Sequence, residues 1–178
     1  MSNPTILALS GSLRSGSTNS RLIDRFAELA PPGVVVDVYR DLERIPPFNP
    51  DHEQTPHADR DAFVERVRRA DALVVSTPEY AHGFPGVLKN ALDWIVGTDA
   101  FVAKPFTLLR ATPRSVHAPA MLIEVLSTMS GLYLEAADVT IDLGRGFGDA
   151  DVILASDATR EQLEQTMGVV AARLRQDA

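Results

Sequence analysis

Short, continuous apolar or β-branched runs alternate along the chain with longer segments in which apolar residues recur at helical spacing. The runs cover residues 5–9, 34–39, 72–76 and 106–109, and a weaker one lies within 132–141. Runs of this length without strict polar alternation are typical of strands that are buried on both faces of a parallel sheet. The pattern therefore predicts five strands.

The segments between these runs have one apolar face each, which predicts about five helices. The faces are marked, in chain order, by Leu22, Phe26 and Leu29; Phe63, Val67 and Ala70; residues 86–96; Met121, Leu122, Val125, Leu126 and Met129; and Leu163, Met167, Val170 and Leu174. Pro85 precedes the third helix, and Gly131 closes the fourth. Thr159 and Gln162 predict a capping box at the start of the last helix.

Strands that alternate with helices imply parallel pairing through right-handed crossovers. We therefore expect an α/β fold: a flavodoxin-like, doubly wound, five-stranded parallel sheet of order 2-1-3-4-5, in which residues 1–178 form a single domain. Such sheets bind ligands beyond the carboxyl ends of their strands, near the point where the order reverses. Here that point lies between the first and third strands. The longest irregular connection, residues 44–59, is interpreted as a lid or an oligomer contact.

Composition narrows the class of protein. A net charge of −7 over 178 residues, without a concentrated basic surface, argues against nucleic acid as a partner. The chain has no cysteine, so it has neither disulfides nor a thiolate metal site. Met1–Pro4 is too short and polar for a signal peptide, and no apolar run approaches the length of a membrane span. We expect a cytoplasmic protein with no membrane partner.

The first candidate site is the loop that joins the first strand to the first helix. Free backbone N–H groups and the positive end of the helix dipole suit an anion there. The loop also supplies polar side chains, namely Ser10, Ser12, Arg14, Ser17, Thr18 and Asn19. It lacks the lysine of an ATP-binding loop and the Gly-x-Gly-x-x-Gly pattern, so a monophosphate fits better than a pyrophosphate. The alternative is that Ser17, Thr18 and Asn19 only cap the first helix.

The second candidate site is the loop after the third strand. Pro78 and Pro85 restrict the backbone between them, so this loop can present its amides in fixed geometry to a planar ring such as a flavin. Tyr80 is placed to pack against the ring or its ribityl chain. The alternative is an ordinary structural turn with Tyr80 and Trp94 in a core or an interface.

Together the two loops resemble one known family. The patterns Gly-Ser-Leu-Arg-x-Gly-Ser-x-Asn and Pro-Glu-Tyr-x-x-x-x-Pro-Gly-Val-Leu-Lys-Asn-Ala-Leu-Asp-Trp are similar to the NADPH-dependent FMN reductases, which include chromate, quinone and azo-dye reductases. The resemblance implies non-covalent FMN and a homodimer or homotetramer. It also implies that Ser12, Arg14, Ser17 and Asn19 hold the phosphate. The ring would be lined by Pro78, Glu79, Tyr80 and the following Ala81, His82 and Gly83.

The activity implied by the resemblance is transfer of a hydride from NADPH or NADH to FMN, and then of electrons to a quinone, a flavin or a similar small acceptor. The flavin carries this chemistry, so we predict no catalytic residue and no metal ligand. His82 is interpreted as a surface hydrogen-bonding residue rather than a proton donor. Arg40, Arg114 and His117 are candidate contacts for a 2′-phosphate.

Two departures from the family pattern keep other functions open. Ala81 stands where relatives usually have Asn, and residues 111–117 replace a Gly-Gly pair. A flavin-binding electron carrier and a flavoprotein without reductase activity are the alternatives. We also expect the helix over 86–96 to contribute to a homodimer that completes the flavin site, because its apolar residues exceed one sheet-facing stripe. These residues are Leu88, Leu92, Trp94 and Ile95.

Overall fold

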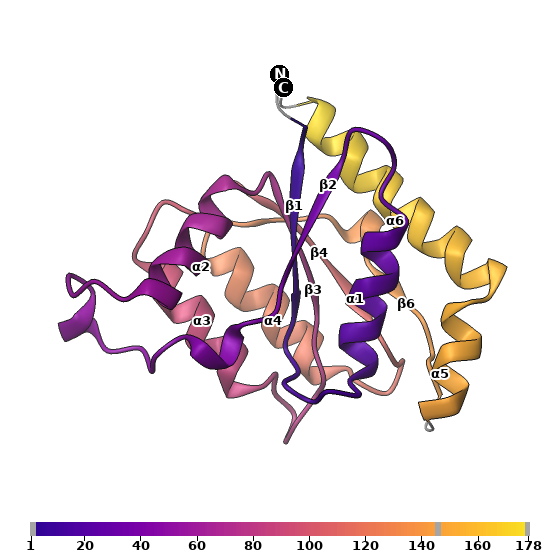
Figure 1. Cartoon of the computed structure of the whole chain (residues 1–178), viewed down its shortest axis with the longest axis horizontal. Coiled ribbons are helices and arrows are strands. Elements are labelled where there is room, and N and C mark those ends of the chain that lie inside the picture. The colour runs from indigo at the N-terminus through magenta and orange to yellow at the C-terminus, as the bar shows by residue number, and fades with distance from the viewer. Residues whose placement is uncertain (1–2, 145–146, 177–178) are drawn as a thin grey trace.

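The computed structural model describes residues 3–144 and 147–176, which form one parallel sheet with helices on both faces (Figure 1). The strands run in the order β2-β1-β3-β4-β5, and β6 also pairs with β4. They are β1 (Thr5–Ser10), β2 (Val35–Tyr39), β3 (Ala72–Ser76), β4 (Pro105–Arg110), β5 (Leu132–Tyr133) and β6 (Val139–Thr140). The predicted fold class and strand order are confirmed.

The predicted fifth strand is divided into two short pieces that both pair with β4. Pro105 pairs with Leu132 in β5, and Arg110 pairs with Thr140 in β6. Between the pieces the chain forms a 3₁₀ turn, η3 (Glu135–Ala137). Asp138, just after this turn, accepts hydrogen bonds from Arg110 Nη2 at 2.7 Å and from the Tyr133 hydroxyl. The turn thus leaves regular pairing in order to place a carboxylate beside β4.

Within the residues that the structure describes, three helices cover each face of the sheet. Helices α1 (Thr18–Glu28), α5 (Phe147–Leu154) and α6 (Asp157–Gln176) lie on one side, and α2 (Ala58–Arg69), α3 (Gly86–Val96) and α4 (His117–Thr128) lie on the other (Figure 1). Alternate residues of β1 face the helices on opposite sides of the sheet. Ile6 and Ala8 pack on the side of α1, and Leu7 and Leu9 pack on the side of α3. Burial on both faces explains why these strands are apolar without alternation.

The start of α6 differs from the prediction. Ser156 caps this helix, because its Oγ accepts a hydrogen bond from the Thr159 backbone N–H at 3.2 Å. Thr159 lies inside the first turn with only 2% of its surface exposed, so the predicted capping box at Thr159 and Gln162 is wrong. Helix α5 is not among the predicted helices.

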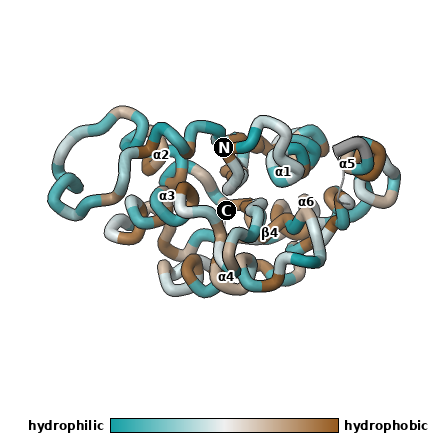
Figure 2. Tube along the Cα trace, turned by 90° about the horizontal axis from the view of Figure 1, so that it is seen from below, coloured by the Kyte–Doolittle hydropathy of each residue, from teal (hydrophilic) through white to brown (hydrophobic). Residues whose placement is uncertain are grey.

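The connection between β2 and α2 contains two 3₁₀ turns, η1 (Leu42–Arg44) and η2 (Pro50–His52). Its residues 45–57, called the arm below, extend beyond α2 and α3 and are mostly hydrophilic in Figure 2. Arg60 of α2 is nearly buried beneath the arm, where its guanidinium donates to three backbone carbonyls at 2.8–3.3 Å. These carbonyls belong to His52, Glu53 and Thr55.

Helix α3 holds the other side of the arm. The Asn90 side chain accepts from the Phe48 N–H at 2.7 Å and donates to the Pro46 carbonyl at 2.9 Å. Trp94 Nε1 donates to the same carbonyl at 2.8 Å, and Phe48 packs edge-on against the Trp94 ring at 5.0 Å. Leu88, Leu92, Trp94 and Ile95 are all buried within the chain. The apolar surplus from which we predicted a dimer contact on α3 is therefore covered by the chain itself.

Candidate functional site

The loop after β1 is organised by hydroxyl groups. Ser17 caps α1, with its Oγ accepting from the Ser20 N–H at 3.3 Å. Ser10 Oγ shares a hydrogen bond of 2.8 Å with Ser20 Oγ and accepts from the Ser12 N–H at 3.3 Å. Capping therefore occurs as the alternative interpretation expected. The cap engages Ser17, the Ser10 hydroxyl is bonded to Ser12 and Ser20, and the rest of the loop opens toward a cleft.

Two close contacts fix this loop against the loop after β3. The buried Asn19 side chain accepts from Ser76 Oγ at 2.9 Å, and the Gly11 N–H donates to the Ser76 carbonyl at 2.8 Å. A Cβ on Gly11 would lie 2.4 Å from Thr77 Oγ1, closer than real atoms approach. Only glycine permits this approach, so the carboxyl ends of β1 and β3 are locked together at the position where the strand order reverses.

The loop after β3 contains a tight turn. Tyr80 and Gly83 exchange backbone hydrogen bonds of 2.8 and 3.0 Å, and the two residues between them have positive φ angles of 49° at Ala81 and 62° at His82. This is the pattern of a type I′ turn, in which Asn and Gly are strongly preferred. Ala81 and His82 therefore hold a conformation that costs roughly 1–2 kcal/mol per residue for ordinary side chains.

Glu79 links this loop to the loop after β4. Its Oε2 accepts from the backbone N–H groups of His117 at 2.8 Å and Ala118 at 3.0 Å, and thereby caps α4. These bonds, first that from Ala118 and then that from His117, lower the pKa of the Glu79 carboxyl; the neighbouring imidazoles of His117 and His82 add to the effect. Sequence reasoning missed this role because the cap lies 38 residues from the helix that it serves.

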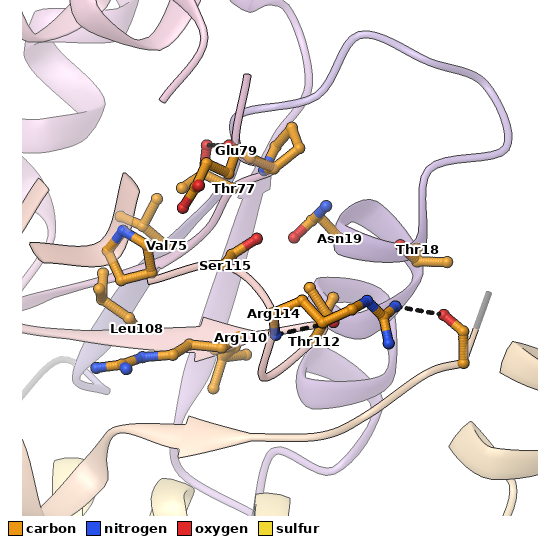
Figure 3. Close-up of a pocket in the computed structure, with 15 residues that line it drawn as sticks. Thr18, Asn19, Val75, Thr77, Glu79, Leu108, Arg110, Thr112, Arg114 and Ser115 are labelled. Atoms are coloured by element: carbon orange, nitrogen blue, oxygen red, sulfur yellow. Dashed lines mark hydrogen bonds between the residues drawn. The ribbon is translucent and has the colours of Figure 1, made fainter. Parts of the chain in front are cut away.

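Arg114 enters the site from the loop after β4. The Arg114 guanidinium donates through Nη2 to the Gly144 carbonyl at 3.2 Å, and the Arg114 backbone N–H donates to Thr112 Oγ1 at 3.3 Å (Figure 3). Arg110, by contrast, extends away from Thr18 and Asn19 in the same view (Figure 3). Arg114 was predicted only as a candidate 2′-phosphate contact, and the structure places it in the wall of the cleft.

The three loops enclose a cleft at the carboxyl ends of β1, β3 and β4. Its outer part has a volume of about 420 Å³ and is lined by Ser12, Arg14, Gly16, Ser17, Thr18, Asn19, Pro78, Tyr80, Arg114 and Gly144. An inner part of about 240 Å³ shares Thr18, Asn19, Pro78, Arg114 and Gly144 with it and adds Glu79, Thr77 and Leu108. The two parts together have the size usual for a small-molecule site.

Most of the predicted site residues meet at this cleft, but four lie apart from its walls. Ser10 faces a separate cavity between α1 and β2, and Ala81, His82 and Gly83 form the turn beyond the cleft. The residues that do meet suit a phosphate-bearing ligand. The open start of α1 and Thr18 lie at one end of the cleft together with Arg14, and the apolar Val75 and Leu108 lie in its inner part.

Known proteins define the class to which this fold and cleft belong. Residues 4–145 match the NADPH-dependent FMN reductases, and the chain belongs to that family. It is therefore a flavodoxin-like flavoenzyme, an oxidoreductase that uses FMN and NAD(P)H. It is 35% identical over 170 residues to an NAD(P)H-dependent FMN reductase of Pseudomonas aeruginosa, covering 91% of this chain and 90% of that protein.

A second relative is a 2-hydroxy-1,4-benzoquinone reductase of a Burkholderia species, with 30% identity over 177 residues and 96% of each chain covered. Among solved structures, a flavoenzyme NAD(P)H:(acceptor) oxidoreductase from Paracoccus denitrificans aligns with a TM-score of 0.77 at 22% identity, over 97% of this chain and 98% of that one. At that identity the structural likeness supports the fold alone.

Proposed function

We propose that this flavoenzyme passes electrons from NADPH or NADH to a quinone, a free flavin or a similar small acceptor. The observation that carries the proposal is the cleft, which has an anion-suited end at the start of α1 and a rim at Tyr80, whose surface is 54% exposed. An anion-suited end beside an open rim leaves room for a second flat molecule. The Pseudomonas relative, an NAD(P)H-dependent FMN reductase, supports NAD(P)H as the electron donor. The Burkholderia relative, a benzoquinone reductase, supports a quinone as the acceptor.

In this reaction the protein binds and orients the FMN. The start of α1, Thr18 and Arg14 would hold the phosphate of FMN, and Pro78 with the backbone of Glu79 and Tyr80 would face its ring. Bound FMN supplies hydride acceptance and release. The Glu79 carboxylate is engaged at the start of α4, so it serves to fix the loop after β3 rather than to exchange protons.

One experiment separates this proposal from the electron-carrier and non-reductase alternatives. Protein reconstituted with FMN is mixed anaerobically with NADPH or NADH, and the flavin absorbance is followed before and after addition of benzoquinone. We expect the flavin to be bleached by the nicotinamide and its colour to return with the quinone. Protein that binds FMN but is not bleached by either nucleotide would contradict the proposal.

We also propose that two copies of the chain associate around the mouth of the cleft, as a homodimer or within a homotetramer. Several apolar side chains there are exposed in the single chain: Tyr80 at 54%, Val116 at 58% and Met121 at 47%. The Met121 thioether lies beside Gly83, so these residues belong to one surface formed by the turn and the start of α4. Exposed apolar patches of this kind often mark contact surfaces.

A further inference from the structure

Three side chains that could bind a metal ion meet where the inner wall of the cleft continues into the turn beyond it, and the proposed reaction does not use them. Glu79, His82 and His117 come from the loop after β3 and from the first residue of α4, and their ligand-capable atoms all lie within 4.8 Å of one another. The two imidazole rings stack with centroids 4.1 Å apart and an angle of 23°. Both histidines are exposed, and neither lines the cleft described above.

We propose that these three residues bind a divalent transition-metal ion such as Zn²⁺. Two imidazoles and one carboxylate are a ligand set that Zn²⁺ accepts, with water in the fourth position. In tetrahedral coordination with bonds of about 2.0–2.2 Å, ligand atoms lie about 3.3–3.6 Å apart. The cluster, whose atoms lie within 4.8 Å of one another, therefore needs to close by up to about 1.5 Å, which rotation of the exposed imidazoles out of their stack provides.

The carboxylate is already oriented for this purpose. Both backbone hydrogen bonds to Glu79 converge on Oε2, at 2.8 and 3.0 Å, and leave Oε1 for an ion. Hydrogen bonds of this kind to a ligating group fix its orientation and support metal affinity. The Tyr80–Gly83 turn places the second ligand. His82 lies in this turn with a φ angle of 62°, and its ring stacks on that of His117.

A bound ion would connect the Tyr80–Gly83 turn to the start of α4. These two segments carry Tyr80, Val116 and Met121, which are exposed at the mouth of the cleft, so the ion would restrain the rim. The inference goes beyond the proposed reductase function and stands without it, since metal binding is measured on the protein in the absence of nicotinamide or acceptor.

The test is equilibrium dialysis of the chelator-treated, FMN-loaded protein against Zn²⁺. We expect saturable binding of one ion per chain, and at least about a tenfold loss of affinity in His82→Ala and in His117→Ala, the size of effect that even secondary partners of a metal site produce. Glu79→Gln keeps an oxygen for the α4 cap but removes the charge, and should also weaken binding. His52→Ala is the matched control, because His52 is an exposed histidine on the arm, outside the cluster.

A measurement on the wild-type protein tests the proposal even if the variants fail to fold. In a two-dimensional NMR spectrum of the imidazole C–H groups, Zn²⁺ should shift the signals of His82 and His117 and leave those of His52 and His57 in place. Three results would overturn the proposal: no saturation by millimolar Zn²⁺, undiminished affinity in folded His82→Ala and His117→Ala, or equal shifts of all four histidines.

Discussion

Arg14 sets the charge at the phosphate end of the cleft. It lines the outer cavity beside Ser12 and Thr18, next to the start of α1, where a phosphate would gain both the helix dipole and a guanidinium. Ser17 and Asn19 are buried and bonded within the protein, so their contribution is to shape the loop. Among the predicted phosphate contacts, Arg14 is therefore the residue whose substitution should weaken binding of the phosphate with the least disturbance of the loop.

We predict that Arg14→Ala weakens FMN binding by about 10- to 150-fold, the equivalent of a charged hydrogen bond worth roughly 1.5–3 kcal/mol. Riboflavin, which lacks the phosphate, should bind with nearly unchanged affinity. Equilibrium dialysis with both ligands measures the difference. Arg25→Ala is the matched control, since Arg25 lies on α1 and pairs with Glu28 away from the cleft. Equal losses for the two ligands would place the phosphate elsewhere.

Ala81 has a structural cost that its sequence position alone does not reveal. The family resemblance implies Asn at this position, so Ala81 lacks a side-chain amide that could meet the flavin or the substrate. The φ angle of 49° adds a second reason for Asn, because a type I′ turn needs the left-handed backbone that Asn and Gly adopt readily.

We predict that Ala81→Gly and Ala81→Asn each stabilise the fold by roughly 0.5–1 kcal/mol, through relief of the left-handed backbone. Only Asn adds a side-chain amide. If that amide meets the substrate, Ala81→Asn should change steady-state rates with quinone or flavin acceptors by several-fold, while Ala81→Gly leaves them near those of the parent protein. Urea unfolding and rate measurements on both variants check this. Equal rates in all three proteins would mean that position 81 does not face the substrate.

At the scale of elements, α3 positions the arm as well as the sheet. Asn90 and Trp94 lie one turn apart, and both bond to the Pro46 carbonyl. The irregular connection that we interpreted from its prolines as a lid or an oligomer contact is thus attached to α3 along 45–48 and to Arg60 along 52–55. Side-chain bonds to backbone carbonyls replace the regular structure that this segment lacks.

We predict that Asn90→Ala lowers the free energy of unfolding by about 2 kcal/mol, since three hydrogen bonds worth roughly 0.5–1.5 kcal/mol each are lost. The Phe48 amide, which donates to Asn90, should exchange with solvent much faster. Denaturant unfolding and hydrogen exchange measure the two effects. Lys89→Ala, at the neighbouring exposed position, should change neither by much. Unchanged exchange at Phe48 in Asn90→Ala would show that the arm is held by other contacts.

Local signals explain which elements the sequence predicts well. Pro85 and Gly97 flank α3, and its observed bounds of Gly86–Val96 agree with the prediction. The start of α6 was placed too late because Thr159 is buried in the helix while Ser156 provides the cap. Pattern alone located the cleft, since parallel strands bring their carboxyl ends to one edge. The α4 cap by Glu79 and the stacked histidines depend on tertiary approach, which spacing along the chain does not encode.

At the scale of the whole molecule, three exposed apolar side chains, those of Tyr80, Val116 and Met121, lie at the mouth of the cleft, whereas the α3 residues from which we predicted a dimer contact are buried. A homodimer formed through Tyr80, Val116 and Met121 would cover them and bring the partner chain close to the flavin. The buried Trp94, by contrast, offers its ring to the arm of its own chain.

We predict that the protein sediments as a dimer or larger assembly at micromolar concentration. Val116→Asp should shift it toward monomer, because the substitution places a charge in the apolar contact, and FMN should then bind more weakly. Val152→Asp is the matched control, at an exposed valine of α5 on the other side of the sheet. A wild-type monomer at this concentration would contradict the proposed assembly.

The division between β5 and β6 has a consequence for solubility. A long, straight edge strand presents unpaired N–H and C=O groups that can template strand addition by another chain. Here the margin beyond β4 consists of two strands of two residues each, interrupted by η3 and by the charged Glu135 and Asp138. This margin offers an incoming strand no continuous ladder. The same irregularity that made the fifth strand the weakest in the sequence pattern therefore protects this edge of the sheet against edge-to-edge aggregation.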